Sequence, residues 1–156
     1  MILGVDPGLN GALAFFDVGA GRITVHDMPT IASGVKSKRV VDEAALAQLF
    51  NGTEAISHAF VEKVGAMPGN GSVSMFGFGV SYGLVRGVLA ANFVPITLVP
   101  PQTWKSKLGV PASKEGARAR ASQLLPAFSH LWPLVKHDGR AEAALIAYYG
   151  VVHAGR

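Results

Sequence analysis

The chain has 156 residues, of which 49% are hydrophobic and 15% are charged, and it contains no cysteine. This length suits a single domain over residues 1–156 with one sizeable core, and the lack of cysteine excludes disulfides and thiolate metal sites. The formal net charge is +4, which suits a polyanionic partner such as nucleic acid but would also serve solubility alone.

The N-terminal stretch MILGVDPGLNGALAFF predicts two buried strands joined by a turn. Its apolar runs, Ile2–Val5 and Ala12–Phe16, are separated by the turn signals Pro7-Gly8 and Asn10-Gly11. The first strand ends on Asp6, and a buried carboxylate is costly unless it is paired, protonated or bound to a metal. Because no basic segment precedes the first apolar run, we expect no signal peptide and a cytoplasmic location.

The rest of the chain predicts strands that alternate with helices, which is typical of an α/β class with a mixed sheet. A third strand is expected over Arg22–Met28, and an exposed loop over Thr30–Val41 carries Lys36, Lys38 and Arg39. The remaining expected elements are strands at Ser57–Val64 and Pro95–Val99 and helices at Asp42–Phe50, Val73–Asn92, Gln102–Leu108, Ser113–Leu125 and Gly139–Val152.

The expected helix over Val73–Asn92 carries Gly79, Gly83 and Gly87 on one face. Each glycine inside a helix costs about 1 kcal/mol relative to alanine. We therefore expect another element to pack closely on this face, with a sheet favoured over a second subunit. The uncharged region around this helix also contains proline, asparagine and many glycines, so we expect no membrane span.

Asp138 and Glu142 are four residues apart, so on the last expected helix they lie on one face, one turn apart. Like charges at this spacing repel each other, and a divalent cation would reverse that penalty. Alternatively, Asp138 caps the helix and Glu142 favours its positive N-terminus. These two residues alone leave a metal site and a helix cap equally open.

Asp6 and Glu62 also have simpler interpretations, because Asp6 can bond its own turn and Glu62 can reach water at the end of a strand. All four acids nevertheless fall on elements that would meet at one end of the sheet. Carboxylate oxygens suit Mg²⁺ or Mn²⁺, and two such ions about 3.5–4 Å apart can promote phosphodiester hydrolysis. We expect two Mg²⁺ or Mn²⁺ ions in the site and no organic cofactor.

Six segments occur in a telling order: ILGVDPGLNGALAF, FVEKV, FGFGVSYGLVRGVL, VPPQTWKSKLG, SKEGARARA and HDGRAEAALIAYYG. Together they resemble the RuvC-type Holliday-junction resolvases of the ribonuclease H-like superfamily, in particular their phage relatives and the plant chloroplast resolvase. The resemblance implies a five-stranded mixed sheet flanked by helices. It also implies a homodimer that nicks two strands of a four-way DNA junction symmetrically, in a bacterial or phage-infected cell.

The same resemblance implies which acids bind metal. Asp6, Glu62, Asp138 and Glu142 match the family's metal-binding positions. Bacterial members carry two aspartates three residues apart in the last helix, whereas the spacing of four seen here is that of the chloroplast type. The assignment of Asp138 and Glu142 as metal ligands therefore depends on the resemblance to the chloroplast type.

The resemblance further implies contacts with DNA. Lys105 and Lys114 match basic positions that contact or activate the scissile phosphate, although either could be a solvated surface lysine. Lys114 is expected to take part in catalysis by steadying the phosphate charge, and Arg118 is expected to hold the DNA backbone. In the loop Gly65–Ser72, where apolar side chains can wedge between bases, the expected DNA contacts are Met67, Pro68 and Asn70.

The sequence leaves three other functions open. The first is a protein that binds DNA junctions without cutting them, and the second is a ribonuclease H-like nuclease that acts on RNA–DNA hybrids. The third is an actin-like phosphotransferase, suggested by the first strand and turn, but the chain is short for the second lobe that such an enzyme needs.

Overall fold

A computed structural model describes residues 1–34, 38–51, 55–65, 71–113 and 115–153. Its centre is a five-stranded sheet in the order β3-β2-β1-β6-β7. The strands β1, β2 and β3 are antiparallel neighbours, whereas β6 and β7 run parallel to β1. This confirms the predicted α/β fold with a five-stranded mixed sheet. The strands are β1 (Ile2–Asp6), β2 (Ala12–Asp17), β3 (Arg22–Asp27), β6 (His58–Glu62) and β7 (Ile96–Val99).

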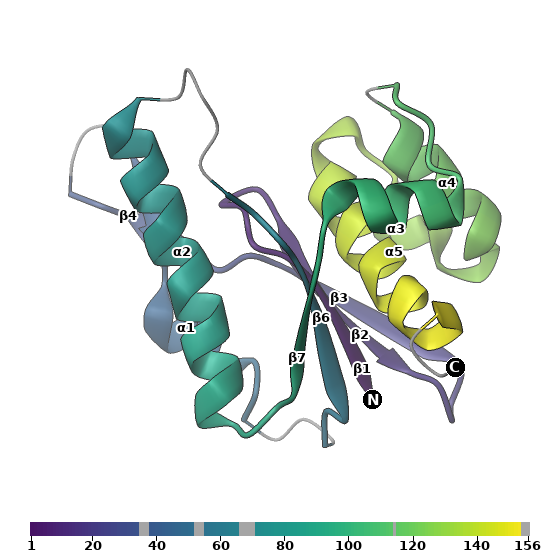
Figure 1. Cartoon of the computed structure of the whole chain (residues 1–156), viewed down its shortest axis with the longest axis horizontal. Helices are drawn as coiled ribbons and strands as arrows, with labels where there is room; N and C mark the ends of the chain where they lie inside the picture. The colour runs from purple at the N-terminus through teal and green to yellow at the C-terminus, as the bar shows by residue number, and fades with distance from the viewer. Residues whose placement is uncertain (35–37, 52–54, 66–70, 114, 154–156) are drawn as a thin grey trace.

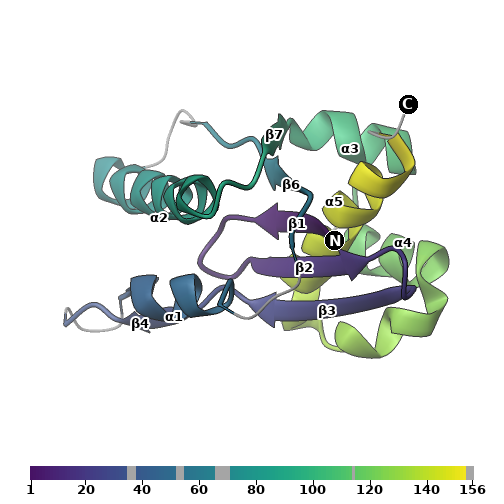
Figure 2. The ribbon, with the colours of Figure 1, turned by 90° about the horizontal axis from the view of Figure 1, so that it is seen from below.

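Helices cover both faces of the sheet (Figure 1). The helices α1 and α2 lie on one face and α3, α4 and α5 on the other, and Figure 2 shows the same layers from below. Because alternate residues of a strand point to opposite faces, Leu3 and Val5 pack toward α1 and α2, whereas Ala12 and Phe60 pack toward α5. The helices are α1 (Glu43–Gln48), α2 (Ser72–Ala91), α3 (Pro101–Leu108), α4 (Gly116–Leu124) and α5 (Asp138–His153), with the 3-10 helices η1 (Pro126–Leu131) and η2 (Val135–His137) before α5.

Helix α5 packs unusually close to the sheet because glycines remove the side chains that would separate them. A Cβ atom at Gly4 of β1 would overlap the Ala143 carbonyl oxygen of α5, and one at Gly150 would overlap the ring of Phe60. At the start of α5, a Cβ atom on Gly139 would overlap the Asn10 carbonyl oxygen in the β1–β2 turn. These contacts fix the height of α5 above the strands.

We expect Gly4→Ala to lower the free energy of unfolding by about 2 kcal/mol, because the added methyl group meets helix backbone that cannot rotate away. Chemical denaturation would measure the change. Gly65→Ala is the matched control, since no described atom lies within 4 Å of the Cβ position there. Equal stability of the two variants would contradict close packing between α5 and β1.

The predicted loop over Thr30–Val41 is wrong in part, because two short strands form within it. The strands β4 (Thr30–Ala32) and β5 (Arg39–Val41) pair antiparallel, with Ile31 opposite Val40. β-Branched residues on both sides favour such pairing even in a short, exposed hairpin. The Arg39 guanidinium donates to Asn10 Oδ1 at 2.5 Å, which ties the hairpin to the β1–β2 turn. Lys36 lies outside the described residues.

The expectation that the glycine face of α2 packs on the sheet is also wrong. The sheet-facing side of α2 is formed by Ser81, Val85 and Leu89, and no described atom lies within 4 Å of a Cβ position on Gly79, Gly83 or Gly87. Helix α2 is also long and apolar enough to cross a membrane, with a mean hydropathy of 1.4. Length and composition alone are weak grounds for a membrane span, and α2 is the only such helix in the part of the chain described.

Candidate functional site

Asp6 and Glu62 lie at the same end of two neighbouring strands. Asp6 is the last residue of β1 and Glu62 the last residue of β6, and the parallel register runs up to the pair Val5 and Val61. Strand alternation turns both acids toward α5, since Gly4 and Phe60, two residues earlier, contact that helix. In Figure 1 both strands end at the upper edge of the sheet. The structure therefore brings these two predicted acids together.

Asp138 and Glu142 start the helix that covers this end of the sheet. Asp138 is the first residue of α5, and Glu142 follows one turn later. The contact of Gly139 with the turn after Asp6 keeps this first turn close to β1. The helix begins at Asp138, one residue before the predicted start at Gly139, so Asp138 lies in its first turn and not at the cap position of the alternative interpretation.

Burial and mutual repulsion act on the acids at the strand ends. Burial raises the pKa of Asp6 from 3.8 to about 6; the Gly8 N–H, which donates to Asp6 Oδ1 at 3.2 Å, opposes the rise and the charge of Glu142 adds to it. Burial, followed by the charges of Asp6 and Glu142, raises the pKa of Glu62 from 4.5 to about 7. Asp6, Glu62 and Glu142 are thus close enough to repel one another.

Two cations approach the acids of α5 from the neighbouring helices. Lys105 Nζ of α3 lies 2.8 Å from Glu142 Oε1, and Arg118 Nε of α4 lies 2.6 Å from Asp138 Oδ1. Burial lowers the pKa of Lys105, but its hydrogen bond to Glu142 and the nearby carboxylates outweigh that effect and raise it overall. Lys105 and Arg118 were predicted to contact DNA, and here each is paired with a predicted metal ligand.

Trp104 is a buried residue at the site that sequence reasoning did not single out. Its side chain is fully buried, and its indole N–H meets no acceptor with hydrogen-bond geometry among the described residues. The same N–H is near enough to Glu62 to oppose the rise in the pKa of that carboxyl. The indole N–H of Trp104 therefore lies beside a candidate metal ligand. It could orient the Glu62 side chain when that carboxyl is ionised.

The donor chemistry of the site fits Mg²⁺ or Mn²⁺, because the four acids offer only carboxylate oxygens. Glu62 is buried and Asp6 is half-buried, and the pKa of each is raised. The arrangement is not a ready-made cage. Within the described ranges no three Asp, Glu or His side chains are disposed to hold an ion as they stand. Lys105 binds Glu142 Oε1 and Arg118 binds Asp138 Oδ1, so each cation competes with an ion for one oxygen of a predicted ligand.

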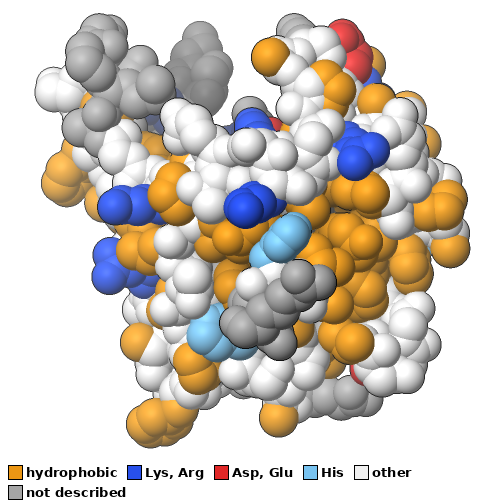
Figure 3. All heavy atoms as spheres, turned by 45° about the vertical axis from the view of Figure 1, so that its right-hand side comes forward, with side chains coloured by type: hydrophobic (Ala, Val, Ile, Leu, Met, Phe, Trp, Pro, Cys, Tyr) orange, Lys and Arg blue, Asp and Glu red, His pale blue; other side chains and the backbone are white. Residues whose placement is uncertain are grey.

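The surface around the site is more basic than acidic. Figure 3 views the side on which α3, α4 and α5 lie, and blue Lys and Arg side chains are spread over it whereas red acidic side chains show only in small areas. A hollow opens at the upper edge of this view, and blue and red side chains meet at its base. This distribution suits a polyanion that approaches the ends of β1 and β6.

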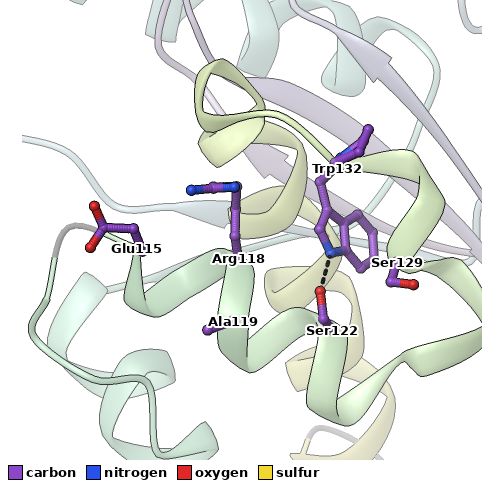
Figure 4. A pocket seen from close by; sticks show the side chains of 7 residues that line it. Glu115, Arg118, Ala119, Ser122, Ser129 and Trp132 are labelled. Atoms are coloured by element: carbon purple, nitrogen blue, oxygen red, sulfur yellow. Dashed lines mark hydrogen bonds between the residues drawn. The ribbon is translucent and has the colours of Figure 1, made fainter.

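A cavity of about 280 Å³ lies beside the site, between α4 and the segment that follows η1. Figure 4 shows that Arg118 and Ser122 line it from one face of α4, with Trp132 opposite. The indole N–H of Trp132 donates to Ser122 Oγ at 3.0 Å. Arg118 connects the cavity with Asp138, but the predicted acids do not line it.

Four of the predicted site residues, Lys114, Met67, Pro68 and Asn70, lie outside the described residues. Their predicted contacts with DNA therefore stay predictions.

An ion pair between Asp27 and Arg140 was not foreseen. Arg140 of α5 donates from Nε to Asp27 Oδ1 and from Nη2 to Asp27 Oδ2, both at 2.6 Å. The two residues are 113 positions apart, and sequence spacing carries no signal for a pair so distant. The same is true of Lys105 with Glu142 and of Arg118 with Asp138.

No family model and no curated protein sequence matches the chain. Among solved structures, RuvC of Thermus thermophilus is similar, with 17% identity and a TM-score of 0.58 over 96% of this chain and 94% of that chain. T. thermophilus RuvC in complex with a Holliday junction substrate gives 15% identity and a TM-score of 0.59 over 97% of this chain and 96% of that chain. At these identities the likeness establishes a RuvC-like fold.

Proposed function

We propose that this protein is a metal-dependent endodeoxyribonuclease that resolves four-way DNA junctions by paired symmetric nicks. The observation that carries the proposal is the meeting of Asp6, Glu62 and Glu142 at one end of a RuvC-like sheet, with Lys105 and Arg118 beside them. The specific subgroup would be the phage and chloroplast type, because of the spacing of Asp138 and Glu142. The single domain would work in the cytoplasm of a bacterial or phage-infected cell.

In this proposal Asp6, Glu62, Asp138 and Glu142 hold two Mg²⁺ or Mn²⁺ ions. Such ions, when bound, activate water and stabilise the attacking and leaving oxygens of a phosphodiester. The chain itself contributes the position of Asp6 and Glu62 at the strand ends, where access of water is restricted. Electrostatic interactions are stronger where water is restricted, because the effective dielectric constant is lower.

Lys105 and Arg118 have a second role in this proposal. In the free protein each neutralises one acid of α5. A DNA phosphate offers both cations a competing anion, so they would turn to the scissile strand while Glu142 and Asp138 turn to the ions. Lys114 would steady the phosphate charge beside them.

The test is to incubate the protein with a labelled four-way junction in Mg²⁺ and to map the cuts on all four strands. Paired nicks at symmetric positions are expected, and binding without cleavage in Mg²⁺ and in Mn²⁺ would leave a junction-binding protein instead. A parallel reaction with an RNA–DNA hybrid duplex separates the ribonuclease H alternative, which would cut the hybrid in preference to the junction.

A homodimer is part of the proposal because symmetric nicks need two active sites. The exposed side of α2 supports it. The residues at heptad spacing on this side have large side chains in the first half of the helix and are glycines in the second half. Among the large ones, Val73 is 70% exposed and Phe76 is 75% exposed. Two α2 helices that cross antiparallel would place each Phe76 ring against a glycine of the other helix, which is knobs-into-holes packing. The positions are Val73, Phe76, Val80, Gly83 and Gly87.

We expect Phe76→Glu to weaken the dimer at least about 30-fold, because an aromatic anchor at the centre of an interface contributes about 2 kcal/mol or more. Sedimentation velocity over a concentration series would measure the dissociation constant. Phe93→Glu is the matched control, since Phe93 is 93% exposed just beyond the end of α2. A dimer that is unaffected by Phe76→Glu, or that dissociates equally with Phe93→Glu, would place the interface elsewhere.

A further inference from the structure

Arg140 joins three parts of the fold at the start of α5. Its guanidinium binds both carboxylate oxygens of Asp27 at 2.6 Å, and its Nη1 donates to the Leu131 carbonyl oxygen at 3.2 Å. The bond to Asp27 lowers the pKa of that carboxyl and raises the pKa of Arg140. This two-pronged contact, which we call the Asp27–Arg140 clamp, is therefore formed between two charged groups with good geometry.

The clamp reaches the same row of the sheet as Asp6. Asp6 is opposite Ala12 in the antiparallel pair of β1 and β2, and Ala12 is opposite Asp27 in the pair of β2 and β3. Asp6 and Asp27 therefore lie in one row, two strands apart, about 9–10 Å from each other. Both point toward α5, because strand alternation places Asp27 on the same face as Ile23 and Val25.

On α5, Arg140 stands between the two candidate metal ligands, two residues after Asp138 and two before Glu142. Asp138 is the first residue of the helix and follows η2 directly. Gly4 and Gly139 set the height of α5 above β1, and both of these contacts lie in β1 or in the β1–β2 turn. Arg140 adds a contact with β3, two strands away from β1, so the first turn of α5 is held at a second place.

We propose that Arg140 and Asp27 are positioning residues, which hold the first turn of α5 against the row that carries Asp6 so that Asp138 and Glu142 meet the ions bound by Asp6 and Glu62. This inference rests on the proposed function, because it assumes that these acids bind metal. Groups that hydrogen-bond a metal ligand commonly change metal affinity 10–100-fold when they are removed. Arg140 would act on the ligands through the position of the helix turn that carries them, and carboxylates must converge on an ion to within about half an ångström.

The signs of two substitutions separate positioning from simple electrostatics. Arg140→Gln removes a positive charge near the site, which by Coulomb attraction alone would tighten a cation. Asp27→Asn removes a negative charge, which by the same reasoning would weaken it. If the clamp positions α5, both substitutions weaken binding of the ion. The double variant then binds the ion no more weakly than either single variant, because both substitutions break the same contact.

The experiment measures Mn²⁺ binding to the intact protein without DNA, by titration calorimetry and by the electron paramagnetic resonance signal of free Mn²⁺. We expect Arg140→Gln and Asp27→Asn each to raise the dissociation constant for Mn²⁺ about 10-fold, and Arg140→Lys to recover part of the loss. Because the clamp is partly exposed, the melting temperature should fall by less than about 4 °C.

Arg22→Gln is the matched control, because it breaks an ion pair at the other end of the β2–β3 hairpin. In that pair Arg22 Nη2 lies 3.6 Å from Asp17 Oδ2. It should leave Mn²⁺ affinity unchanged. Tighter Mn²⁺ binding by Arg140→Gln, or unchanged Mn²⁺ binding by Asp27→Asn, would overturn the positioning role. The proposed metal site would not be affected by that result. No Mn²⁺ binding by the unmodified protein would overturn the proposed function as well.

Discussion

Asp6→Asn is expected to reduce the rate of junction cleavage at least about 10³-fold while leaving junction binding in place. Asp6 lies close enough to Glu142 and Lys105 that both of their charges act on its carboxyl. Asparagine keeps the shape and one oxygen but removes the charge that would hold cations. Binding to DNA depends instead on the basic surface, which this substitution leaves intact.

The measurement is single-turnover cleavage of a labelled four-way junction in Mg²⁺, with binding followed separately by a mobility shift in Ca²⁺. Asp17→Asn is the matched control, because Asp17 is the last residue of β2 and lies by the start of β1, at the end of the sheet away from Asp6. It pairs with Arg22. Cleavage by Asp6→Asn at the rate of the unmodified protein would rule out a metal site at this end of β1.

The free energy of unfolding of the metal-free protein is expected to fall by up to about 5 kcal/mol as the pH rises from about 4 to about 7. In the folded protein the pKa of Asp6 is raised from 3.8 to about 6 and that of Glu62 from 4.5 to about 7. Between these values the folded protein binds more protons than the unfolded chain. Stability is therefore greatest below the unfolded pKa values and declines as the two carboxyls ionise.

Urea denaturation across this pH range, in the presence of a chelator, would measure the decline. The double variant Asp6→Asn with Glu62→Gln should lose the slope and be more stable than the unmodified protein at pH values above about 7. Mg²⁺ or Mn²⁺ should restore stability to the unmodified protein and not to the double variant. Equal pH profiles for the two proteins would show that these acids are not desolvated by the fold.

The central sheet was predictable because its signals are local. Apolar runs of four and five residues that end at turn signals predicted β1 and β2, and the segment Ser57–Val64 predicted β6, whose alternation placed Glu62 on the face of Phe60. The meeting of Asp6 and Glu62 then followed from the parallel pairing of neighbouring strands. Helical spacing gave the one-turn relation of Asp138 and Glu142 for the same reason.

The cations of the site could not be predicted in their present roles because their partners are distant in sequence. Lys105 and Glu142 are 37 positions apart, and Arg118 and Asp138 are 20 apart. Lysine and arginine on short polar helices are usually solvated, and only the tertiary arrangement of α3 and α4 against α5 pairs them with acids. A contact of this kind leaves no periodic or compositional trace.

The interpretation of the α2 glycines failed for a related reason. Their spacing correctly indicated one face free of side chains, but spacing does not say which of the two faces of a helix is turned to the core. Burial of Val85 and Leu89 on the opposite side settled the orientation. The inference of a close neighbour therefore passes from the sheet to the second subunit of the proposed dimer.

The burial of α5 divides the site into a fixed half and an adjustable half. The residues from Ala143 to Ala147 are fully buried on a helix enclosed by the sheet on one side and by α3 and α4 on the other. The acids are thus carried by parts of the fold that tolerate little change in volume. The cations stand on two short helices at the periphery, so selection for a different DNA substrate has room to alter them without disturbing the carboxylates.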